Sequence, residues 1–84
     1  LKNKNNYLKN YKMAQYKVIT ALKTQAEADK AKALMALELL TEMAVGIGDH
    51  TANDFLKDAT ESLKLLASAE ERLEIIEKYY GKNE

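Results

Sequence analysis

Carboxylates at helical spacing are the side chains of this sequence that could do chemistry. Glu38 and Glu42 lie four residues apart, and a second group follows at Asp54, Asp58 and Glu61. Carboxylates on the facing helices of a bundle can hold divalent metals for hydrolysis. One alternative is therefore a metal-dependent all-α hydrolase that uses these helix carboxylates.

The sequence lacks the other parts of such a site. The di-iron pattern of four-helix bundles needs Glu-x-x-His motifs, and this sequence has none. Its single histidine, His50, directly follows Asp49. The chain has no cysteine, which excludes disulfides and thiolate metal sites. It also has no glycine-rich phosphate loop and no nucleophile beside a base. We therefore expect no catalysis, no bound metal and no cofactor.

Lysines and tyrosines alternate near the start of the chain and could bind nucleic acid. Residues 1–26 contain six lysines and no acidic residue, and Tyr7, Tyr11 and Tyr16 lie among them. Lysines such as Lys4, Lys9 and Lys12 can follow phosphates while aromatic rings stack on bases. However, 13 basic and 13 acidic residues give a net charge of zero. A nucleic-acid-binding accessory protein is thus an alternative, and nucleic acid is not the expected partner.

The composition predicts that helices alone position these side chains. The chain has 84 residues, three glycines, no proline and 46% hydrophobic residues, so it has few breaks and room for one domain. No apolar run reaches the roughly 18 to 20 residues of a membrane span, and the start has no apolar signal core. We expect one all-α domain over residues 1–84 that is soluble, cytoplasmic and independent of membranes.

Glycine spacing predicts one reversal of the chain. Gly46 and Gly48 fit the end of a first helix, and Thr51 with Asp54 has the spacing of a capping pair that starts a second helix. The result is a long antiparallel helical hairpin. Its expected parts are a helix over about 6–45, a turn over about 46–51, a helix over about 52–80, and flexible ends at 1–5 and 81–84.

A second capping pair leaves another fold open. Thr24 and Glu27 match the start of a helix, in a stretch where only alanine marks the apolar face. A break near residues 23–26 would give a three-helix bundle. No glycine or proline accompanies this pair, which favours the continuous helix.

Apolar residues three or four apart predict which sides of the two helices meet. On the second helix this stripe contains Ala52, Leu56, Ala59, Leu63, Leu66, Ala69, Leu73, Ile76 and Tyr80. If the chain reverses near residues 46–51, positions whose numbers add up to about 97 lie level. The first helix should then extend past the second at the open end of the hairpin.

Apolar residues on several sides of the first helix predict self-association. Eleven of the fifteen residues from 33 to 47 are apolar, whereas a hairpin hides a single stripe of each helix. Small chains commonly complete a thin core by association, so we expect a homodimer that forms a four-helix bundle. The predicted self-interface contains Leu34, Met35, Leu37, Leu40, Met43 and Ile47.

All five tyrosines map to the open end of the hairpin, opposite the turn. Tyrosine combines a large apolar ring with a polar tip and is enriched at protein interfaces. We expect a surface there for a second copy or for an unidentified protein partner, made of Tyr7, Tyr11, Tyr16, Tyr79 and Tyr80. The predicted function is a non-catalytic protein-interaction module with a structural or regulatory role.

Overall fold

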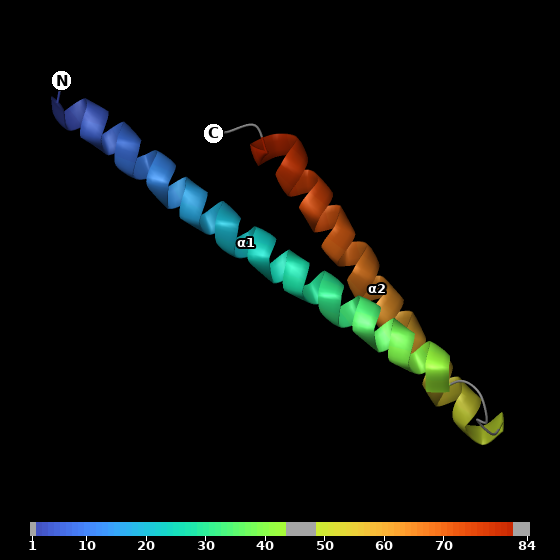
Figure 1. The fold of residues 1–84 in the computed structure, drawn as a ribbon. Helices are drawn as coiled ribbons and strands as arrows, with labels where there is room; N and C mark the ends of the chain where they lie inside the picture. Colours follow the sequence, from blue (N-terminus) through green and yellow to red (C-terminus); the bar gives the residue numbers. More distant parts are fainter. Residues whose placement is uncertain (1, 44–48, 82–84) are drawn as a thin grey trace.

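In a computed structural model, the chain forms two antiparallel helices (Figure 1). The structure describes residues 2–43 and 49–81, and the surroundings of side chains for residues 7–43 and 52–81. Helix α1 spans Lys2–Met43 and helix α2 spans Asp49–Tyr80. The two helices pack against each other, which confirms the all-α class and the helical hairpin.

Both helices begin earlier than the sequence predicted. α1 begins at Lys2 instead of residue 6, and α2 begins at Asp49 instead of residue 52. Thr51 therefore lies inside α2, so its predicted role as the N-cap was wrong. α2 ends at Tyr80, as predicted. The predicted turn glycines, Gly46 and Gly48, lie outside the described residues.

α1 is continuous through residues 23–26, where a break would have produced three helices. Thr24 Oγ1 donates a hydrogen bond to the carbonyl of Thr20 at 2.8 Å. This bond to the residue four positions earlier is typical of threonine inside a helix, whereas an N-cap hydroxyl accepts a bond from a following amide. The capping pair is thus not used, and the three-helix alternative was wrong.

The contact between the helices follows alternating steps of four and three residues. On α2 it runs through Phe55, Ala59, Ser62, Leu66, Ala69, Leu73 and Ile76, which are all buried or half-buried. Steps that average 3.5 residues keep one seam facing the partner helix, as in coiled coils. The predicted stripe also included Leu56 and Leu63, but these are 66% and 58% exposed. Counted back from Ala69, the alternating steps of three and four residues pass through Ser62 and Phe55 instead of Leu63 and Leu56.

Alanines form the centre of this contact. Ala26 and Ala33 on α1 and Ala69 on α2 are 0% exposed, and no other hydrophobic residue of the described part of the chain is buried. Helix separation depends on the side chains at the contact, so alanine lets the two backbones approach closely. On α1 the contact continues through half-buried Ile19 and Leu37. The hairpin core is therefore narrow.

Two ion pairs flank the alanines and define the register. Arg72 Nη2 lies 2.9 Å from Asp29 Oδ2, and Lys30 Nζ lies 3.7 Å from Glu70 Oε2. Asp29 and Lys30 fall on opposite sides of the contact, because successive helical residues are about 100° apart. The paired residue numbers add up to 101 and 100. The register thus differs by three to four residues from the predicted one.

The Arg72 pair should contribute measurably to stability. Arg72→Met removes the bond to Asp29 and a 3.2 Å hydrogen bond from Arg72 Nε to the carbonyl of Ser68. We expect the free energy of unfolding to fall by about 1 kcal/mol, because the pair is only part-buried. Chemical denaturation followed by circular dichroism would measure it. Lys30→Met, which breaks the longer and more exposed pair, is the control and should change stability by less than about 0.5 kcal/mol.

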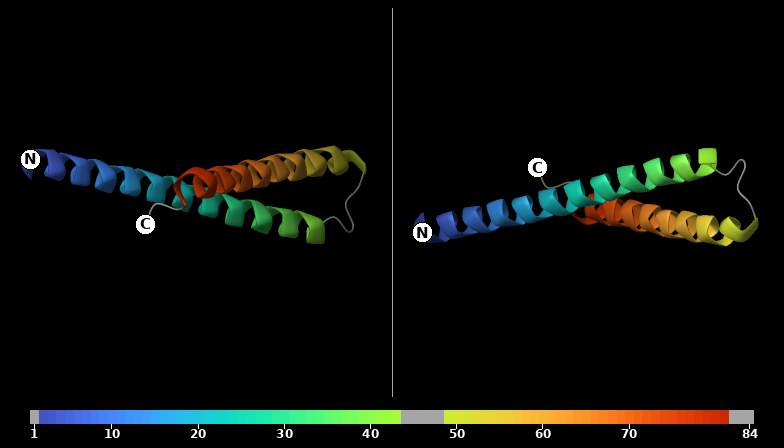
Figure 2. Two further views of the ribbon diagram at one scale, coloured as in Figure 1. Left: turned by 90° about the horizontal axis from the view of Figure 1, so that it is seen from above. Right: turned by 90° about the horizontal axis from the view of Figure 1, so that it is seen from below.

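The hairpin is long and thin. Its extents are 71 × 17 × 16 Å and its radius of gyration is 19.8 Å, whereas a compact domain of this length would have a radius of about 12 Å. Figures 1 and 2 show the N-terminal part of α1 extending past the C-terminal end of α2. We call residues 2–16 of α1 the arm.

Candidate protein-interaction surfaces

The residues of the predicted self-interface fall in two different places. Leu37 and Leu40 are half-buried and line a groove between α1 and α2 with Phe55 of α2. They are thus partly used inside the hairpin. Ile47 lies outside the described residues. The remaining three residues are exposed on α1: Leu34, Met35 and Met43.

α1 carries a second line of side chains with the spacing of a coiled-coil contact. It alternates steps of four and three residues and lies about a quarter turn from the line that faces α2. All of its residues are exposed, and its five large apolar side chains, at positions 7, 11, 18, 35 and 39, are 49% to 69% exposed. We call this line the outer seam. It consists of Tyr7, Tyr11, Ala14, Val18, Ala21, Gln25, Ala28, Lys32, Met35 and Leu39.

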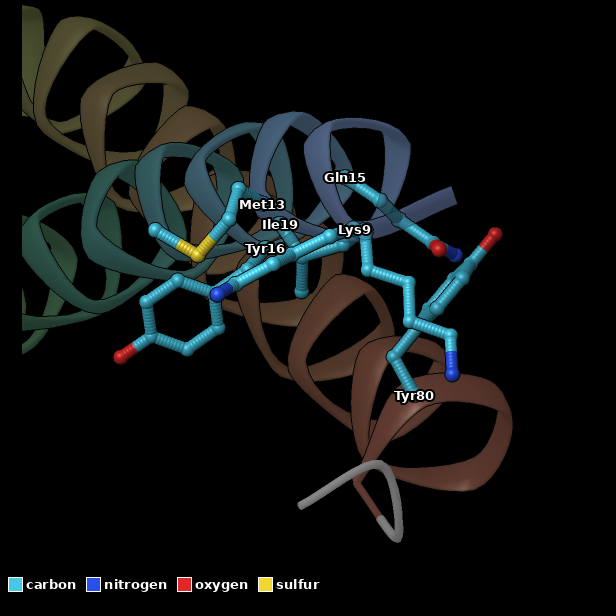
Figure 3. A pocket seen from close by; sticks show the side chains of 7 residues that line it. Lys9, Met13, Gln15, Tyr16, Ile19 and Tyr80 are labelled. Carbon is cyan, nitrogen blue, oxygen red and sulfur yellow. The ribbon is translucent and has the colours of Figure 1, made fainter. Parts of the chain in front are cut away.

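Two of the predicted tyrosines line a groove at the open end of the hairpin. Tyr16 of α1 and Tyr80 of α2 line this groove, which has a volume of about 360 Å³. Figure 3 shows Lys9 and Gln15 extending from α1 toward the side of Tyr80, and Tyr16 on the other side of the groove. The groove is completed by Lys12, Met13 and Ile19.

The other three tyrosines do not line this groove. Tyr7 and Tyr11 lie on the arm, where they are 69% and 61% exposed. Tyr79 is exposed near the end of α2, and the Nζ atom of Lys78 lies 5.4 Å from the centroid of its ring, a cation–π arrangement. The five tyrosines therefore occupy one end of the hairpin but belong to different surfaces.

Charge separates along the length of the hairpin. Residues 2–23 contain six lysines and no acidic residue. Toward the turn, residues 34–43 and 49–63 contain six acidic residues and one lysine. Lys9 and Lys12 are exposed on the arm, and the binding of nucleic acid by this arm stays an untested alternative. The separation gives the two ends of the hairpin opposite charges.

The acidic candidates for chemistry lie on two helices. Glu38 and Glu42 are exposed on α1, and a second exposed set on α2 contains Asp54, Asp58 and Glu61. Within residues 7–43 and 52–81, whose side chains the structure describes, no three histidine, cysteine or acidic side chains come together as possible metal ligands. The side chains of Asp49 and His50 lie outside the described part.

Comparison with protein-family models, with curated proteins and with solved structures finds no match to this chain. The role of its surfaces must therefore follow from their own geometry and chemistry. In the part of the chain that the structure describes, neither helix has a stretch apolar enough to cross a membrane.

Proposed function

We propose that this chain is a non-catalytic helical module that binds a second copy of itself and works through protein contact in a structural or regulatory role. The observation that carries the proposal is the unburied surface. The hairpin exposes 7307 Å², whereas a compact monomer of this mass exposes about 5,000 Å². A standard interface buries about 800 Å² on each partner. The excess is larger than the surface that a stable dimer needs.

The composition of the core supports the same proposal. Among the described residues, the fully buried hydrophobic side chains are Ala26, Ala33 and Ala69, and no large side chain is fully buried. Burial of apolar area contributes about 25 cal/mol per Å², so three alanines contribute little. Short chains with such thin cores are commonly stabilised by association. Two hairpins packed against each other, which the sequence predicts as a four-helix bundle, would cover large apolar side chains that α1 leaves exposed, such as Met35 and Leu39.

Sedimentation equilibrium over a range of concentrations tests the proposal. We expect a species of twice the 9.5 kDa chain mass, with dissociation only on dilution. Circular dichroism on the same samples should show the helical hairpin. A folded chain that keeps the mass of one copy at every concentration would contradict self-association.

A further inference from the structure

We propose that the second copy binds antiparallel along the outer seam of α1. The arm of each copy then lies against the turn-side part of α1 in the other copy. This inference rests on the proposed self-association and adds its site and its orientation. It is carried by the spacing of the outer seam, by the sizes of its side chains and by the charges beside it.

The outer seam pairs well with itself when the two copies of α1 run in opposite directions. In the best register, level residues have numbers that add up to 46, which aligns the four-three steps of both copies. Large side chains then meet large ones toward the ends, because Tyr7 comes level with Leu39 and Tyr11 with Met35. A two-fold axis generates each of these pairs twice. The dimer contact lies mainly between the two α1 helices and is not a full four-helix bundle, because in this register the two α2 helices overlap only beside about residues 20–26 of α1.

Small side chains occupy the middle of the same seam. In this register Val18 comes level with Ala28, and Ala21 with Gln25, so the two α1 helices can approach closely near the axis. Lys32 comes level with Ala14, where its long aliphatic chain can cover the alanine while its ammonium group reaches water. The polar residues of the seam thus do not prevent this contact.

Charge favours the antiparallel orientation over the parallel one. Asp54, Asp58 and Glu61 precede Arg72 by 18, 14 and 11 residues, which are close to whole numbers of helical turns. They therefore share the side of α2 on which Arg72 meets Asp29. Asp29 lies between the α2-facing side of α1 and the outer seam, so Glu61, which is level with residue 40 of α1, lies beside the turn-side end of the seam, and Asp54 and Asp58 lie just beyond it.

An antiparallel partner would place its arm beside this acidic group. The lysine-rich N-terminal segment would then lie toward the acidic end of the other copy, and the attraction acts between the two ends as wholes, because Lys9 and Lys12 lie on the side of α1 away from the seam. A parallel partner would instead bring the lysine-rich segments of both copies together, and like charges facing each other oppose association. The preferred occupant of the outer seam is therefore a second copy of this chain in the antiparallel direction.

Disulfide cross-linking tests the orientation, because the chain has no cysteine of its own. Tyr11→Cys and Met35→Cys are made in separate chains, mixed and oxidised. In the antiparallel dimer these positions come level, and a disulfide between the two variants is expected as the main product. Each position lies 24 residues, or about 36 Å along the axis, from its own copy, so neither variant alone should cross-link.

Lys9→Cys mixed with Glu38→Cys is the matched control. These residues are almost level in the same register and are exposed, but they lie on the other side of α1, so they should not cross-link. Self-linking of Tyr11→Cys and of Met35→Cys would show a parallel dimer and overturn the inference while self-association stands. A dimer that forms none of these disulfides would overturn it too. A monomer in sedimentation would instead overturn the proposed self-association.

Discussion

Leu39→Glu is expected to raise the dissociation constant of the dimer about 1,000-fold. Leu39 is 49% exposed in the single hairpin and would be covered by Tyr7 of the second copy. Placing a carboxylate there costs about 2 kcal/mol per site, and the two-fold axis repeats the cost. A total of about 4 kcal/mol corresponds to the stated change in affinity. Sedimentation equilibrium of the variant beside the parent chain would measure it.

Leu34→Glu is the matched control for this substitution. Leu34 is 48% exposed on the same helix, and the variant changes the net charge by the same amount. Leu34 lies on the side of α1 away from the outer seam, because it precedes Leu39 by five positions, which is about 140° around the helix axis. We expect its dissociation constant to stay within about threefold of the parent value. Equal weakening by both variants would contradict the assignment of the dimer contact to the outer seam.

The hairpin could be predicted from the sequence because the chain has few helix-breaking residues. With no proline and with two of its three glycines at 46 and 48, the sequence allows long helices and one reversal. The register was harder to predict. The earlier start of α2 alone would lower the sum of level residue numbers, whereas the Arg72–Asp29 pair gives 101 instead of about 97. The first residues of α2 therefore lie beyond the end of α1 at the turn (Figure 2), which glycine spacing alone does not predict.

The inner faces of the helices were predicted only in part. Apolarity pointed to Leu56 and Leu63, whereas the contact uses Phe55 and Ser62. A two-helix contact needs continuous four-three spacing more than it needs a large apolar residue at every step. Two series with this spacing can be traced along α2, one through Leu56 and Leu63 and one through Phe55 and Ser62. The position of α1 decides which of them lies in the contact.

The outer seam was missed because the apolar residues were counted within one segment. Residues 33–47 stand out by composition, so the predicted interface mixed residues that face α2, such as Leu37, with residues of the outer seam, such as Met35. The available signal was a second four-three series along the whole of α1, beginning at Tyr7. The alanines of this series give no clear signal, because alanine is compatible with buried and exposed positions alike.

Ala33→Leu is expected to lower the free energy of unfolding by about 2 kcal/mol. Ala33 is 0% exposed between α1 and α2, where the larger side chain would force the helices apart or into strained rotamers. The midpoint of thermal unfolding should fall by about 10 °C, since a chain of this size loses about 4 to 8 °C per kcal/mol. Circular dichroism at a fixed protein concentration would follow the transition.

Ala31→Leu separates this steric effect from a general effect of leucine in α1. Ala31 is exposed on the same helix, and leucine is nearly as good a helix former as alanine, so its midpoint should stay close to that of the parent chain. An Ala33→Leu midpoint equal to that of Ala31→Leu would mean that the two helices do not approach closely at Ala33. A clear difference would locate the closest approach of α1 and α2 at the alanines, because only there does added volume meet the partner helix.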